Sequence, residues 1–274
     1  MWGSGARGFP YAERAVALAS ESEDLEANAE AMGAKAMAAA FSGRFDSSMA
    51  LHDAVLELAE RRGDAWTIAM VEAGAALAAL GSGNLEAAER RQAHATEAAD
   101  QAGNPFAIAF SRLNGGRLAG WAGRMDEARS LFAEAYAGYR QIGDTRFELV
   151  ARSDLAHALR RGGAFDEAEA IYRETIRAWQ HLGSRGAIAS QLESFGFLAQ
   201  ARGDPRTAAR LLGAAEILRE RVAAAMLPFE RVEYERHVEQ LRESLDAATR
   251  EEEWTAGRSM SMEDAIAFAV ADST

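Results

Sequence analysis

Glycine recurs at a fixed forty-residue interval along most of this 274-residue chain. One series stands at Gly43, Gly83, Gly123, Gly163 and Gly203, and a second stands at Gly63, Gly103, Gly143 and Gly183. Glycine readily adopts the left-handed backbone conformation that ends many helices. Two interleaved series therefore predict a repeat of two helices, with a glycine after each helix.

Side chains that cap helix N-termini follow the second series. Asp64, Asn104, Asp144 and Ser184 come directly after its glycines, and Asp24 continues the pattern upstream. Their oxygen atoms accept hydrogen bonds from the free amides of a first helical turn. We therefore expect five helix pairs, near 25–61, 65–101, 105–142, 145–182 and 185–222.

Small residues also keep the forty-residue period. They stand in the first helix of each pair at Ala36, Ala76, Gly116, Ala156 and Gly196, and in the second helix at Ser48, Ala88, Ala128, Ala168 and Ala208. Such positions are typical of helices that approach too closely for a larger side chain. The pattern predicts an all-α solenoid of antiparallel helix pairs, in which each pair buries its apolar face against its neighbours.

The two ends of the chain depart from the repeat. We expect residues 1–8 to be a disordered lead-in and residues 9–225 to be the solenoid, with Tyr11–Ser20 as the second helix of a partial repeat. Residues 226–274 would form C-terminal capping helices, because a solenoid needs a terminal element with a polar outer face. In this tail, Pro228 predicts a long charged helix through about Arg250, and Ser261 with Asp264 predicts a capped helix over Met262–Val270.

The repeat resembles the tetratricopeptide repeat family. The residues that carry the likeness are Leu155, Ala156, Leu159, Gly163, Phe165, Ala168 and Tyr172, which stand in the order and spacing of that consensus. The forty-residue length is similar to the longer-helix variety, and a glycine and a cap replace the repeat-ending proline. The resemblance implies a right-handed superhelical solenoid with a concave groove for a protein or peptide.

A second resemblance concerns the C-terminal part, residues 203–270. The stretches around Arg210–Glu216 and Trp254–Ala265 are similar to the C-terminus of large bacterial signal-transduction ATPases and LuxR-type transcriptional regulators. The phosphate loop of such ATPases needs a lysine after its second glycine, and the single lysine of this chain, Lys35, follows Ala34. Nucleotide hydrolysis therefore cannot be carried over, and the expectation is the sensor or interaction part of a regulator.

Composition excludes several classes of protein. The chain contains no cysteine and has a formal net charge of −12. A disulfide framework, a thiolate metal site and a cysteine nucleophile are therefore excluded, and an acidic chain lacks the basic face of a nucleic-acid binder. No segment approaches the roughly 18 apolar residues of a membrane span. We expect a cytoplasmic protein without direct contact to nucleic acid or membrane.

The sequence contains no recognisable catalytic or metal-binding motif. The five histidines lie on different expected helices with no spacing typical of a metal site, and no nucleophile motif is present. An enzyme would depend on His157 near Asp154 and Arg160, a combination common on protein surfaces. We therefore expect a non-enzymatic protein without a cofactor or metal.

The first helices supply the candidate binding groove. Its predicted residues are Asn114, Arg117, Trp121, Asp154, His157, Arg160, Arg161, Glu193, Phe197 and Gln200. Arginines beside aromatic rings would hold a carboxylate and an apolar side chain of a peptide or a small effector. The alternative interpretation is that these residues are the polar surface that any solenoid must expose.

A further alternative is an architectural protein without a ligand. The first expected helix lacks the upstream neighbour of a full repeat, and Phe9, Tyr11 and Val16 form its expected apolar face. Either the chain is cut from a longer protein, or this face binds another subunit and drives self-association into a homodimer.

Overall fold

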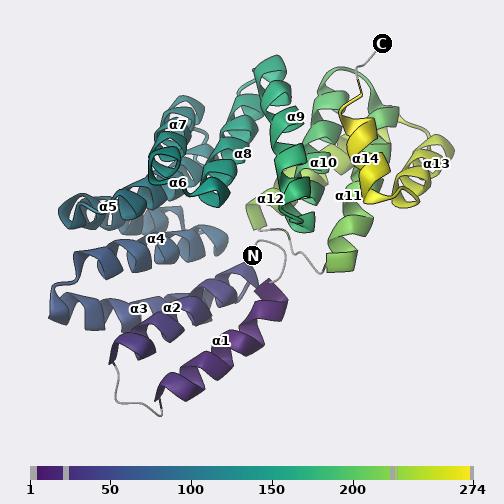
Figure 1. Ribbon diagram of the computed structural model, residues 1–274. Coiled ribbons are helices and arrows are strands. Elements are labelled where there is room, and N and C mark those ends of the chain that lie inside the picture. Colours follow the sequence, from purple (N-terminus) through teal and green to yellow (C-terminus); the bar gives the residue numbers. More distant parts are fainter. Residues whose placement is uncertain (1–4, 21–24, 223–225, 227, 272–274) are drawn as a thin grey trace. The chain divides into compact units, whose positions relative to one another are not determined.

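The computed structural model describes residues 5–20, 25–222, 226 and 228–271, and within these residues every regular element is an α-helix. The chain divides into two compact units, one over residues 5–158 and one over the described residues from Leu159 onward. The helices are labelled in Figure 1: α1 Gly5–Ser20, α2 Leu25–Phe41, α3 Phe45–Arg62, α4 Ala65–Gly81, α5 Leu85–Ala102, α6 Pro105–Trp121, α7 Met125–Ile142, α8 Thr145–Arg161, α9 Phe165–His181, α10 Arg185–Ala201, α11 Pro205–Val222, α12 Pro228–Ser244, α13 Ala247–Arg258 and α14 Met262–Ala269.

The glycine series end helices as expected. All nine glycines have a positive φ, between 60° and 83°. Of the predicted caps, Asp64 accepts a hydrogen bond from the Thr67 amide (3.1 Å), Asn104 from Ala107 (3.2 Å) and Asp144 from Phe147 (2.9 Å). The Ser184 side chain makes no capping hydrogen bond, so that prediction was wrong. Asp24 lies outside the described residues.

The small residues mark close helix contacts. Ala88, Ala128, Ala168 and Ala208 are fully buried, and the Ser48 hydroxyl donates to the Ala36 carbonyl at 2.8 Å. A Cβ atom added to Gly116 would lie 2.7 Å from the ring of Phe132 in the partner helix. The predicted helix pairs, and with them the all-α repeat fold, are confirmed: each of the five pairs, from α2–α3 to α10–α11, begins and ends within one residue of its expected bounds.

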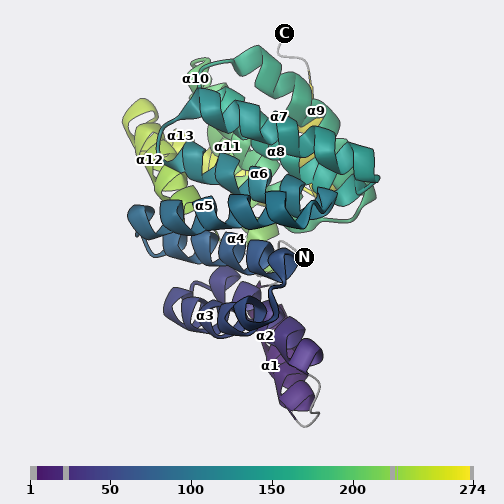
Figure 2. The same cartoon turned by 90° about the vertical axis from the view of Figure 1, so that its left-hand side faces the viewer.

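The unit over residues 5–158 is built from successive antiparallel helices that pack on their neighbours. Figure 2 shows α4 and α5 running side by side. Aromatic rings from α6, α7 and α8 form one cluster, in which Phe147 lies 5.0 Å from Tyr139 and 5.3 Å from Phe106 between ring centroids. This cluster connects α6, α7 and α8 through their aromatic side chains.

The N-terminal helix is longer than expected. Gly5–Gly8 belong to α1, although they lie within the segment predicted to be a disordered lead-in. Residues 1–4 of that predicted segment lie outside the described residues.

The tail folds differently from the prediction. A single helix from Pro228 to Arg250 was expected, but α12 ends at Ser244 and α13 begins at Ala247. The break follows from Asp246, whose carboxylate accepts hydrogen bonds from the amide and hydroxyl of Thr249 (3.0 and 2.6 Å). The capping box at Ser261 is confirmed, because its hydroxyl accepts from the Asp264 amide at 3.0 Å.

Glycines allow α13 to pack closely on α11. A Cβ atom added to Gly257 would lie 1.9 Å from the Arg210 carbonyl oxygen, and one added to Gly213 would lie 2.3 Å from that of Trp254. The two backbones are therefore in direct contact. In Figure 1, α13 and α14 lie beside α11, and this contact makes the tail part of the same compact unit.

Candidate functional site

A shallow hollow lies between α4 and α6, which are the first helices of two successive repeats. Its volume is about 10 Å³, roughly the space of one water molecule, and its lining is Ala76, Leu77 and Leu80 from α4 with Asn114 and Leu118 from α6. Four of these five side chains are apolar. The hollow is therefore a small apolar depression with a single polar member, Asn114.

Asn114 supplies the polar atom of this hollow. Its side chain is 5% exposed, and its amide nitrogen donates to the Phe110 carbonyl at 2.9 Å. That bond orients the amide and leaves the buried Oδ1 atom without a hydrogen-bond partner. A buried acceptor without a partner is costly, so this oxygen is ready to accept from an N–H or O–H group.

An ion pair beside the hollow connects α6 to α8. Arg117 of α6 donates to Asp154 of α8 at 2.8 Å, and these side chains are 11% and 19% exposed. Trp121, one turn beyond Arg117, is 39% exposed, and His157 is half-buried. We name the surface formed by the hollow, this ion pair and Trp121 the α4–α6–α8 face.

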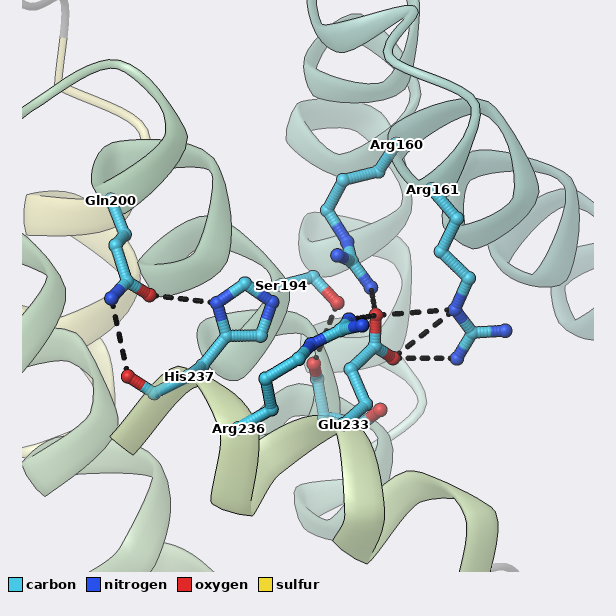
Figure 3. Close-up of polar contacts among 8 residues, drawn as sticks. Arg160, Arg161, Ser194, Gln200, Glu233, Arg236 and His237 are labelled. Carbon is cyan, nitrogen blue, oxygen red and sulfur yellow. Dashed lines mark hydrogen bonds and ion pairs between the residues drawn. The ribbon is translucent and has the colours of Figure 1, made fainter. Parts of the chain in front are cut away.

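Four of the predicted residues farther along the chain, Arg160, Arg161, Phe197 and Gln200, contact the chain's own helix α12. Glu233 of α12 accepts hydrogen bonds from Arg160 (2.7 Å) and Arg161 (2.6 Å), as Figure 3 shows. Burial alone would raise the pKa of Glu233, but the charges of Arg160 and Arg161 hold it well below its usual range. The carboxylate is therefore ionised at neutral pH.

His237 makes the second contact of α12. Its ring stacks on Phe197 with centroids 3.9 Å apart, and its Nδ1 lies 2.7 Å from the side-chain oxygen of Gln200. Burial lowers the pKa of His237 to about 4, and the charge of Arg160 adds to that shift. The ring is neutral at pH 7, and because the Gln200 oxygen can only accept, Nδ1 carries the proton.

Glu193 lies in a separate ion pair. It is 6% exposed and accepts from Arg219 of α11 at 2.5 and 2.8 Å. Of the ten predicted groove residues, the structure thus brings Asn114, Arg117, Trp121 and Asp154 together on one face and places Arg160, Arg161, Phe197 and Gln200 against α12. The arginines predicted to hold a ligand carboxylate already bind carboxylates of the chain.

No prediction from the sequence included the α12 residues that contact the groove residues. Glu233, His237 and Leu241 are four residues apart, which puts them on one side of a helix, and this spacing is visible in the sequence. The hydrogen-bond partners of Glu233 and His237 lie between 37 and 73 positions away along the chain, and nothing in the sequence pairs them. The predicted enzyme combination is likewise divided, because Asp154 binds Arg117 and Arg160 binds Glu233.

The predicted self-association residues do not share one surface. Phe9 is 6% exposed and lies under the guanidinium of Arg44, 4.1 Å from its ring centroid. Val16 is half-buried, whereas Tyr11 is 78% exposed. A second exposed apolar residue, Leu18 at 59%, stands seven positions after Tyr11 and on the same side of α1.

Neither a metal-binding cluster nor a membrane-spanning helix is present among the described residues. No three histidine or acidic side chains there are grouped to hold a metal ion. No helix in the same residues is long and apolar enough to cross a membrane.

Comparisons with known proteins agree with the repeat architecture. Residues 107–181 match the sequence model of the tetratricopeptide repeat. No curated protein sequence matches the chain.

Solved structures match over most of the chain. BtubC (BKLC) from P. vanneervenii matches with a TM-score of 0.61 and 16% identity, over 81% of this chain and 94% of that one. A Rap protein complexed with Competence and Sporulation Factor gives 0.63 and 17%, over 86% and 71%. The apo form of RapI gives 0.57 and 14%, over 88% and 92%.

At these identities the matches concern the fold alone. They do not extend to the ATPase and LuxR-type regulators that residues 203–270 resemble, and that resemblance stays a prediction. The chain has the all-α fold of tetratricopeptide-like solenoid proteins.

Proposed function

We propose that this protein is a non-enzymatic recognition module that binds a peptide or protein segment on the α4–α6–α8 face. The observation that carries the proposal is the unpartnered, buried Oδ1 of Asn114 at the base of an apolar hollow. The similarity to a Rap protein complexed with Competence and Sporulation Factor supports a binding role for this fold. A role as the sensor part of a bacterial regulator belongs to the same proposal.

The chemistry of the face defines the ligand. An apolar side chain of the ligand would pack over Leu77, Leu80 and Leu118, and a backbone N–H group next to it would donate to Asn114. The Arg117–Asp154 pair presents a donor and an acceptor of balanced charge, which suits a neutral peptide backbone better than a free carboxylate. Trp121 adds an exposed ring beside them.

The test begins with peptides selected from a random displayed library on the full chain. Their affinities are then measured by fluorescence anisotropy for the wild type and for Asn114→Leu and Trp121→Ala. Loss of one buried hydrogen bond should weaken binding about tenfold. Ile142→Ala is the matched control, since Ile142 is exposed to 41% at the end of α7, compared with 39% for Trp121. Unchanged affinity in both face variants would refute the proposal.

A second candidate function is homodimerisation through α1. The exposed side chains of Tyr11 and Leu18 favour it, because both lie on one side of this helix. Tyr11→Asp combined with Leu18→Asp should convert a dimer into a monomer in sedimentation equilibrium. The wild-type chain is measured over a 100-fold range of protein concentration. A wild-type chain that is still monomeric at the top of this range would exclude this function.

A further inference from the structure

Helix α12 is held by few buried side chains. Among its residues 230–244, only Glu233 and Leu241 are buried, whereas α10 buries ten residues. Val232, on the outer side of α12, is 60% exposed. Segments with few buried contacts are the ones that open locally while the rest of a fold stays intact.

The surface under α12 is chemically specific. Two guanidinium groups, from Arg160 and Arg161, meet one carboxylate, so this point carries excess positive charge in a chain of net charge −12. The Phe197 ring follows, with the Arg160 guanidinium 4.9 Å from its centroid. An apolar cluster of Phe197, Ala208, Ala209 and Leu212 then receives Leu241, which is fully buried.

Helix α12 matches this surface with one stripe of side chains. Its carboxylate, ring and leucine stand at positions 233, 237 and 241, each one helical turn after the last. Removing α12 would leave Arg160, which is 6% exposed, without its carboxylate. Because a buried charge without a partner is strongly unfavourable, whatever replaces α12 must also supply a carboxylate at this point.

We propose that Arg160, Arg161, Phe197 and the apolar cluster around Leu212 form a second protein-binding surface, which α12 occupies in the free protein. Its partner is a helix of another protein that carries an acidic residue, a flat ring four residues later and a leucine four residues after that. This surface lies wholly in the unit that begins at Leu159, so the inference stands independently of the α4–α6–α8 face.

The first experiment asks whether α12 opens on its own. The chain has no cysteine, so a single Leu241→Cys variant of the full chain reports the access of a thiol reagent to this position. Leu192→Cys is the matched control, because Leu192 is also fully buried but lies in α10. We expect Leu241→Cys to react at least tenfold faster than Leu192→Cys. Equal rates would mean that α12 opens only when the whole unit unfolds, which would overturn the inference.

The second experiment tests whether a separate peptide with the α12 sequence binds to the surface that α12 covers. The probe is a fluorescein-labelled peptide of residues 228–244, and the receptor is the full chain with Glu233→Ala and Leu241→Ala, which removes both buried anchors of α12. The peptide should bind this variant at least tenfold more tightly than it binds the wild type. A peptide carrying Glu233→Gln should bind at least tenfold more weakly than the native peptide.

Equal binding to variant and wild type, or equal binding of the two peptides, would overturn the inference. If the double variant does not fold, as judged by its far-UV circular dichroism, the native peptide is added to Leu241→Cys instead. There it should accelerate thiol labelling at least threefold, because it competes with α12 for the same surface. A rate that does not change would count against the inference.

Discussion

Two adjacent glycines of α6 should respond to the same substitution with opposite signs. Replacing either Gly115 or Gly116 with alanine recovers about 0.8–1 kcal/mol of helix propensity. A Cβ atom on Gly115 would lie 3.5 Å from its nearest neighbours, which is an ordinary contact. On Gly116 it would lie 2.7 Å from two ring atoms of Phe132, which is 4% exposed and cannot move away freely.

Overpacking of this kind costs about 1–3 kcal/mol. Gly115→Ala should therefore stabilise the protein by about 0.8 kcal/mol, and Gly116→Ala should destabilise it by up to about 2 kcal/mol. Urea titrations followed by far-UV circular dichroism measure both shifts. In a Phe132→Leu background, the cost of Gly116→Ala should largely disappear. Shifts of the same sign for both variants, or an unchanged cost without the Phe132 ring, would refute the argument from close helix contact.

Three further changes test caps and a buried histidine. Ser184→Asp should stabilise the protein by about 1 kcal/mol in the same urea assay. The reason is that Ser184 has nearly the same backbone dihedrals as the capping residue Asp64, but its own side chain makes no capping hydrogen bond. An unchanged stability would show that these dihedrals are not enough for an aspartate to cap α10. Asp246→Ala should remove the cap of α13 and increase amide exchange at the start of this helix, and unaltered exchange would contradict the assigned break. Burial lowers the pKa of His52 to about 4, below its unfolded value, so its contribution is complete above pH 6.5 and falls as the pH drops toward 4. The loss between pH 8 and pH 5 should be about 2 kcal/mol, and His52→Gln should remove that part of the slope.

The helix pairs could be predicted because their signals are local and repeated. A glycine, a cap and a small residue each act within one turn or one helix hairpin, and five repeats present them at the same spacing. The prediction failed at Ser184 and Asp246 because a capping residue type does not fix whether its side chain bonds to the helix. Asp246 bonds to Thr249 and starts α13, whereas Ser184 leaves its helix uncapped.

Only the part of the candidate site that lies on repeat helices could be predicted from the sequence. The forty-residue period correctly places Arg117 and Asp154 on neighbouring helices, where they form an ion pair. The period stops before α12, so it gives no indication that Glu233 binds Arg160 across 73 positions. Charged residues in a polar helix look the same in a sequence whether they face water or a buried guanidinium.

The pairing of Glu233 with two arginines also limits which explanations of α12 are physically reasonable. A helix that serves only as an end cap can cover an apolar surface with leucine and alanine, and replacing a buried ion pair by apolar groups often costs nothing. Here α12 instead places a charged group and a neutral histidine against Arg160, Phe197 and Gln200. Such polar contacts add little net stability but discriminate strongly between occupants. The composition of this contact therefore favours selective recognition of one kind of helix over simple coverage of the last repeat.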